Sequence, residues 1–97
     1  MKLEAALYDF MIRVRDDPRI GPSHISLYMA IIFSFAHQKF NIATQISSKV
    51  LMRQAKISSK VTYYKCIKDL KEAGYIRYLP SYDPALGSLI YLNKLTE

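Results

Sequence analysis

The sequence predicts a mainly α-helical domain of four helices that ends in a small β-hairpin. Apolar residues recur at helical spacing in four stretches, and serines and glycines stand where these stretches begin and end. An alternation of aromatic and aliphatic residues follows the last stretch, as in short strands. The 97 residues fit one domain, and 51% of them are hydrophobic, which argues against a disordered chain.

The first expected helix covers residues 2–17 and carries one apolar stripe. The stripe repeats at intervals of four, three and four residues, as on one face of a helix, and consists of Leu3, Leu7, Phe10 and Val14. It packs either against its own domain or against the same stripe of a partner subunit, in the manner of a short coiled coil. The second alternative predicts a homodimer.

A second helix is expected from residue 23 to about residue 38, with Ser23 as its cap. Apolar side chains cover well over half of its circumference, among them Ile25, Tyr28, Met29, Ile32, Phe33, Phe35 and Ala36. A helix that is apolar nearly all round lies in the core of a soluble domain. We therefore expect its aromatic and methionine side chains to be core packing and not a cofactor site.

A helix-turn-helix is expected in the middle of the chain. A brief strand at residues 41–43 precedes a short helix that is capped by Ser47 or Ser48 and ends near residue 55. A turn at residues 56–58 leads into the next helix. Two helices joined by three or four residues form a helix-turn-helix by length, although this turn lacks the glycine often found there.

The helix after this turn has the clearest signals in the chain. Ser58 or Ser59 opens it, because a serine hydroxyl accepts hydrogen bonds from the free amides of a first turn, and Gly74 closes it. One side of its helical wheel is apolar and contains Tyr63, Cys66, Ile67, Leu70 and Ala73. The opposite side contains Val61, Tyr64, Lys65, Lys68 and Glu72, with Thr62 on the flank. The apolar side can hold the helix on a core while the other side faces a partner.

Two strands are expected after Gly74, at residues 75–79 and 89–92, joined by a loop that contains Pro84 and Gly87. The complete order is then helix, helix, strand, helix, helix, strand, strand. This is the order of a winged helix-turn-helix fold, a three-helical core plus a two-stranded wing, with an extra N-terminal helix.

The positive charge of the chain is concentrated around the helix-turn-helix. The net charge is +6, and residues 39–78 hold nine basic and two acidic side chains. No acidic residue occurs between residues 18 and 68. A patch of one sign attracts polyanions, whereas a solubilising surface usually mixes both signs. Nucleic acid is therefore the expected partner.

The last two predicted helices and the hairpin resemble a known family. The region reads KISSKVTYYKCIKDLKEAGYIRYLPSY…GSLIYL, which looks like the recognition helix and wing of bacterial winged-helix DNA-binding proteins. With DDPRIGPSHISLYMAI ahead of it, the chain is similar to short transcriptional-regulator-like proteins of bacterial conjugative and mobilisable elements. The resemblance covers roughly residues 16–92. It implies sequence-specific binding of double-stranded DNA, by a transcriptional regulator or by an accessory factor for excision or transfer.

This reading divides the chain into an N-terminal amphipathic helix for packing or dimerisation, residues 1–17, and a winged-helix DNA-binding domain, residues 18–97. Phosphate contacts are expected at the N-terminus of the recognition helix, where free amides bind anions, from Ser58 and Ser59. Groove contacts are expected from Lys60, Thr62, Tyr64 and Lys65. Further phosphate contacts are expected from Lys49, Lys68 and Arg77.

Two other functions stay open. One is a winged-helix module for protein–protein interaction without DNA binding, and the other is RNA binding, for which the eight tyrosines offer stacking surfaces. No metal, cofactor or enzyme chemistry is expected, because His24 and His37 have no carboxylate or thiol at ligand spacing and no catalytic grouping occurs. One cysteine and the absence of a signal-peptide or membrane-spanning pattern predict a cytoplasmic, nucleoid-associated protein.

Overall fold

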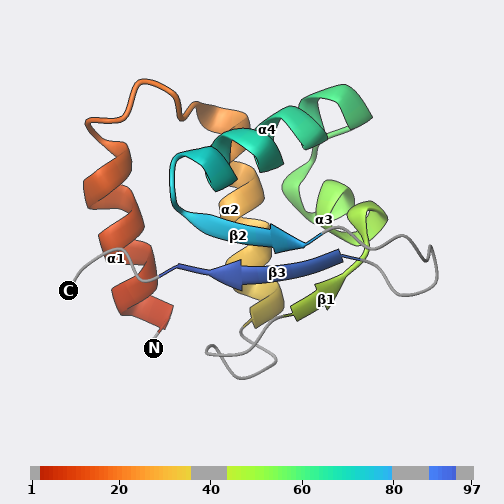
Figure 1. Ribbon diagram of the computed structural model, residues 1–97, viewed down its shortest axis with the longest axis horizontal. Helices are drawn as coiled ribbons and strands as arrows, with labels where there is room; N and C mark the ends of the chain where they lie inside the picture. The colour runs from red at the N-terminus through yellow and green to blue at the C-terminus, as the bar shows by residue number, and fades with distance from the viewer. Residues whose placement is uncertain (1–2, 36–43, 80–87, 94–97) are drawn as a thin grey trace.

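The computed structural model describes residues 3–35, 44–79 and 88–93, and the side chains of residues 4–35, 47–79 and 89–93. Within these ranges four helices and three strands follow in the order α1–α2–β1–α3–α4–β2–β3 (Figure 1). The helices are α1 (Leu3–Val14), α2 (Pro22–Phe35), α3 (Ser48–Ala55) and α4 (Lys60–Glu72). The strands are β1 (Thr44–Ile46), β2 (Ile76–Leu79) and β3 (Ser88–Leu92). The predicted fold is confirmed: a winged-helix-like arrangement with an extra N-terminal helix.

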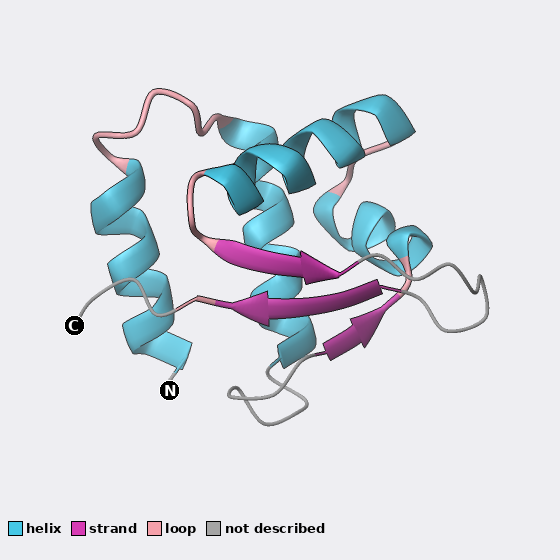
Figure 2. Cartoon of the chain, in the orientation of Figure 1, coloured by secondary structure: helices cyan, strands magenta, loops and turns pink. Residues whose placement is uncertain are grey.

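The hairpin is part of a three-stranded antiparallel sheet with the order β1-β3-β2. In the hairpin, Ile76 lies opposite Leu92 and Leu79 opposite Leu89. On the other edge of β3, β1 is added with Thr44 opposite Ile90. In the view of Figure 2 the three strands lie side by side and α2 passes behind them. The brief strand expected at residues 41–43 lies outside the described residues, and β1 begins directly after it.

The first two helices begin and end at slightly different residues than expected. α1 ends at Val14 and not at residue 17, because Pro18 disfavours the helical conformation for the residue before it. α2 begins at Pro22, whereas Ser23 was expected to be its cap. Proline is favoured at the first helical position because its missing N–H is not needed there. The expected end of this helix near residue 38 lies outside the described residues.

The core joins α1 to the rest of the domain through three aromatic rings. The rings of Phe10 and Tyr28 are stacked, with centroids 3.7 Å apart. The Tyr75 ring meets both of them edge-on, at 5.2 Å from Phe10 and 6.4 Å from Tyr28. All three side chains are buried. The N-terminal helix therefore shares one hydrophobic core with α2 and the start of the sheet.

A polar contact supports this aromatic cluster from the α1–α2 connection. The Tyr75 hydroxyl donates a hydrogen bond to Asp17 Oδ2 at 2.9 Å. Arg19 donates to both oxygens of the same carboxylate, through Nε and Nη2, at 2.9 Å each. Burial and the bond to Asp17 raise the pKa of Tyr75 to about 12. The phenol therefore stays protonated at neutral pH and keeps its donor role.

Candidate nucleic-acid interface

α4 has a buried side and an exposed side, as the sequence predicts. The buried side consists of Tyr63, Cys66, Ile67 and Leu70, and burial raises the pKa of the Cys66 thiol. The opposite side consists of Val61, Tyr64, Lys65, Lys68 and, in the last turn, Glu72, all exposed. We call the stripe of Val61, Tyr64, Lys65 and Lys68 the outward face of α4. Their spacing of three, four and seven residues places them on one stripe along the helix. This stripe is free to meet a partner.

The start of α4 is fixed by Ser59. This residue has an extended backbone, and its hydroxyl accepts a hydrogen bond from the Thr62 amide at 3.2 Å. The prediction that Ser58 or Ser59 opens the helix is thereby resolved in favour of Ser59. Ser58, Ser59 and Lys60 are all exposed, so the remaining free amides of the first turn and a lysine stand together at the surface.

The turn between α3 and α4 works without a glycine because Lys56 takes the left-handed conformation, with φ of 63°. The Ile57 amide then donates to Met52 O at 2.9 Å and closes the end of α3. Ile57 itself is buried and fills the space between the helices. The Ser26 hydroxyl of α2 donates to Ala55 O and ties the end of α3 to the core helix.

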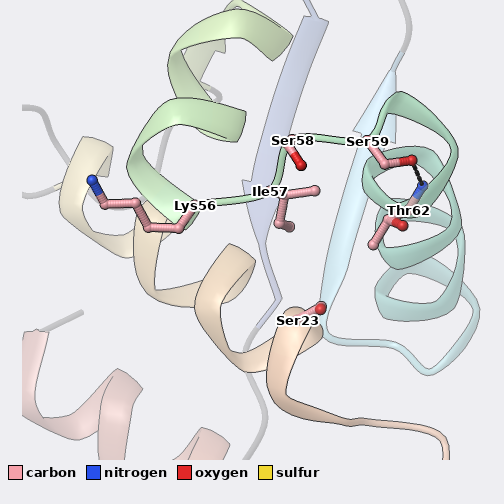
Figure 3. A pocket seen from close by; sticks show the side chains of 6 residues that line it. All are labelled: Ser23, Lys56, Ile57, Ser58, Ser59 and Thr62. Carbon is pink, nitrogen blue, oxygen red and sulfur yellow. Dashed lines mark hydrogen bonds between the residues drawn. The ribbon is translucent and has the colours of Figure 1, made fainter.

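A small hollow of about 200 Å³ lies at this turn, between the N-termini of α2 and α4 (Figure 3). It is lined by Ser23, Lys56, Ile57, Ser58, Ser59 and Thr62. Figure 3 shows the Lys56 side chain directed away from the serines. Thr62 is half-buried and belongs to this hollow, beside the outward face of α4 and not at its centre.

The position of α4 on the domain is set by a hydrogen bond between its Asp69 and His24 of α2. His24 Nδ1 accepts from the Gly21 amide at 3.0 Å, so the ring proton is on Nε2, which donates to Asp69 Oδ2 at 2.8 Å. Lys65 Nζ donates to the same oxygen at 2.9 Å. The hydrogen bond from His24, followed by that from Lys65, lowers the pKa of Asp69, and the carboxylate in turn raises the pKa of Lys65. Lys65 is therefore charged but partly neutralised by Asp69.

Two other predicted contact residues lie on elements next to α4 in the chain, α3 and β2. Lys49 is exposed in the first turn of α3, and Arg77 is exposed on β2. The Arg77 guanidinium carbon lies 5.0 Å from the centroid of the Tyr91 ring on β3, which holds this side chain against the sheet. Eight of the nine predicted residues are thus exposed, and Thr62 is half-buried.

The apolar stripe of α1 packs against its own chain. This holds for those of its side chains that the structure describes. Phe10 and Val14 are buried in the core, and Leu7 is partly buried against it. The side chain of Leu3 lies outside the described part of the chain. Of the two alternatives for this stripe, packing on the own domain therefore accounts for Phe10 and Val14. Dimer formation stays a prediction, and the loop of the wing at residues 80–87 is not described.

Val61 is a further exposed residue of the outward face of α4 and was not among the predicted contact residues. This valine is the most exposed large hydrophobic residue of the described chain, at 81%. It lies in the first turn of α4, opposite the buried side of the helix. The sequence contains a signal for this exposure, because Val61 falls on the polar side of the helical wheel. An apolar residue on that side cannot be buried in the core.

Among the described residues, no three histidine, cysteine, aspartate or glutamate side chains are grouped so that they could hold a metal ion. None of the described helices is both long and apolar enough to cross a lipid bilayer.

Comparison of the chain with protein families, with curated proteins and with solved structures finds no match. The function proposed below therefore rests on the fold and on the side chains of this chain.

Proposed function

We propose that the protein binds double-stranded DNA sequence-specifically through α4. The observation that carries this proposal is the outward face of α4. Its side chains are exposed, two of them are lysines, and the reverse side of the same helix is buried in the core. A helix held in this way can enter the major groove of a duplex, where its first turns reach the base edges.

The residues around α4 support the same partner. The exposed amides at Ser59 and the Lys60 ammonium stand at the helix N-terminus, where an anion is stabilised. Lys49 on α3 and Arg77 on β2 carry positive charge on two neighbouring elements. Contacts of these residues with phosphates would orient α4 in the groove, while the outward face of α4 would contact bases.

The biological role we propose is that of a transcriptional regulator, or of an accessory factor for excision or transfer of a mobile element, in a bacterial cytoplasm. We base this role on the resemblance of the stretch KISSKVTYYKCIKDLKEAGYI and the strands after it to the recognition helix and wing of such proteins, not on a matching family or relative. A homodimer is part of this proposal, because a two-fold symmetric protein reads two half-sites about 34–36 Å apart along the duplex. Sites selected from a random duplex pool would then be palindromic, and the molecular mass in solution would be that of two chains.

The test is a titration of random and genomic duplexes at two salt concentrations. Six phosphate contacts, for example, would give a slope of about −5 in a plot of log affinity against log salt concentration. Lys60→Glu and Lys65→Glu should each weaken binding to every duplex by at least tenfold, because each replaces an attraction to phosphate by a repulsion. Arg15→Glu is the matched control, since it makes the same charge change at an exposed position directly after α1 and should have little effect. Absence of binding at 50 mM salt would reject the proposal.

The same experiment separates the alternatives. A protein-interaction module would retain its function in the Lys60→Glu and Lys65→Glu variants. RNA binding would appear as successful competition by single-stranded RNA against duplex DNA. Tyr28, Tyr63 and Tyr75 are buried and present no ring face to a base, whereas Tyr8 and Tyr64 are exposed.

A further inference from the structure

We propose that Val61 reads a thymine, by contact between its side-chain methyl groups and the C5-methyl group in the major groove. This inference rests on the proposed DNA binding and deepens it, because it assigns a base preference to one position of the site. Val61 was not among the residues expected to contact DNA, and its role follows from where the fold places it.

The placement of Val61 is the first argument. It is the second residue of α4 after the Ser59 cap, and 81% of its surface is exposed. Tyr63, Cys66, Ile67 and Leu70 form the buried side of this helix, and Val61 points the opposite way. The first turn of a recognition helix is the part that reaches base edges. Among the residues of the outward face of α4, Val61 is therefore the one in the turn that would contact base edges directly.

The surroundings of Val61 are the second argument, because they select the partner. Lys65 and Lys68 follow it on the outward face of α4, and Lys60 precedes it in the chain. Tyr64 lies one turn after Val61 on the same face and is also exposed. A protein surface that docks on an apolar patch is itself apolar, whereas this valine and tyrosine stand among lysines. A duplex offers the matching combination, with phosphates for the lysines and an apolar group inside the groove for the valine.

The chemistry of the side chain is the third argument. Valine has no hydrogen-bonding group, so it cannot read the donors and acceptors on base edges. The thymine methyl is the apolar group that the major groove displays, and small apolar side chains contact it. Valine is also stiff at χ1, so its two methyl groups keep a defined position on the helix.

The experiment uses duplexes in which deoxyuridine replaces thymidine one position at a time, within a site selected from a random pool by the full chain. Deoxyuridine pairs as thymidine does and lacks only the C5-methyl group. At the position facing Val61, the substitution should weaken binding of the unaltered protein about fourfold, the factor that corresponds to one buried methyl group. Val61→Ala should bind the thymidine duplex more weakly and show a smaller difference between the two duplexes at that position, because only one methyl group remains and it reaches less far from the helix.

Val50→Ala is the matched control, because Val50 is also an exposed valine of the helix-turn-helix, on α3. This variant should keep the fourfold difference. Circular dichroism should show both variants folded, since both residues are exposed on helices and alanine favours helix. Equal binding of the unaltered protein to thymidine and deoxyuridine duplexes at every position would overturn the inference and leave the proposed function standing. An undiminished difference between the thymidine and deoxyuridine duplexes in Val61→Ala would also overturn the inference and leave the proposed function standing. Absence of binding to any duplex would reject both.

Discussion

His24 at the start of α2 and Asp69 in α4 lie 2.8 Å apart, measured from Nε2 to Oδ2, although 45 residues separate them in the chain. The Asp69 carboxylate also holds Lys65, one turn earlier on α4. One acidic side chain thus fixes the helix to the core and at the same time restrains a lysine of the outward face of α4. Stability of the fold and affinity for a polyanion are opposed at this residue.

Asp69→Asn is therefore expected to destabilise the protein and to strengthen DNA binding. Hydrogen bonds to charged groups contribute about 1.5–3 kcal/mol, and the amide retains part of this, so we expect a loss of about 1–2 kcal/mol in the free energy of unfolding. Loss of the Asp69 charge strengthens the attraction of Lys65 to phosphate, which should raise the affinity for a duplex at low salt. Urea unfolding and fluorescence anisotropy with a labelled duplex measure the two effects.

Glu72→Gln is the control for this variant. It removes the same charge from an exposed position of α4, and Glu72 has no ion-pair partner in the described part of the chain. Its free energy of unfolding should stay within about 0.5 kcal/mol of the parent value. If Asp69→Asn binds the duplex no more tightly than Glu72→Gln, Lys65 is not released towards phosphate.

Acid should destabilise the protein partly through Asp17. The side-chain hydrogen bond from Arg19, assisted by that from Tyr75, holds the pKa of this carboxyl well below its usual range in the folded state. The unfolded chain therefore takes up the proton first, and the stability that Asp17 contributes is present above the unfolded pKa of about 3.9. It is lost as the pH falls from about 5 towards the lowered pKa of the folded state.

Asp17→Asn should accordingly be less stable than the parent at pH 7 and should lose less stability between pH 5 and pH 3, as measured by urea unfolding. Asp16→Asn is the neighbouring control, because Asp16 is exposed and the hydrogen bonds of Asp17 remain in that variant. A parent-like acid dependence in Asp17→Asn would show that the contacts with Arg19 and Tyr75 do not act in solution.

The two left-handed residues of the helix ends should respond in opposite ways to substitution. Lys56 carries a side chain at φ of 63°, which costs roughly 1–2 kcal/mol, partly offset by the entropy that glycine loses on folding. Lys56→Gly should therefore stabilise the protein by about 0.5–1 kcal/mol.

Gly74→Ala, at φ of 87°, should destabilise it by roughly 1 kcal/mol. The added Cβ meets nothing closer than Arg13 Nη2 at 4.0 Å, so the backbone alone is responsible. Thermal unfolding midpoints in opposite directions are the expected result, and a destabilised Lys56→Gly would contradict it.

Phe10→Ala should cost roughly 3–5 kcal/mol of unfolding free energy, because the ring is fully buried against Tyr28 and Tyr75. Since this packing lies within one chain, the size of the loss should not depend on protein concentration. Urea unfolding at two concentrations tests both points. Tyr8→Ala on the exposed side of the same helix is the control and should change stability little. A loss that appears only at high concentration would mean that Phe10 is buried by a partner subunit.

The parts of the fold that the sequence predicts well are those specified by nearby residues. Ser47 caps α3, Ser59 caps α4 and Gly74 follows α4 in a left-handed conformation, and each of these signals acts within one helical turn. The buried and exposed sides of α4 follow from helical periodicity in the same way. The placement of eight predicted contact residues at the surface depends on this local information.

The remaining features depend on contacts that local patterns do not encode. The addition of β1 to β3 and the contact of His24 with Asp69 join residues far apart in the chain. The left-handed Lys56 could not be predicted, because lysine has no preference for that conformation and the surrounding helices impose it. The start of α2 was misplaced by one residue because Pro22 favours the first helical position more strongly than Ser23 favours the cap.

The central place of β3 in the sheet bears on how the protein is made. Ribosomes synthesise a chain from its amino end, so β1 and β2 emerge before the strand that lies between them. Until Ser88–Leu92 has been made, neither of these strands has its neighbour in the sheet. We therefore expect the sheet to be completed late in folding, after the helices have formed.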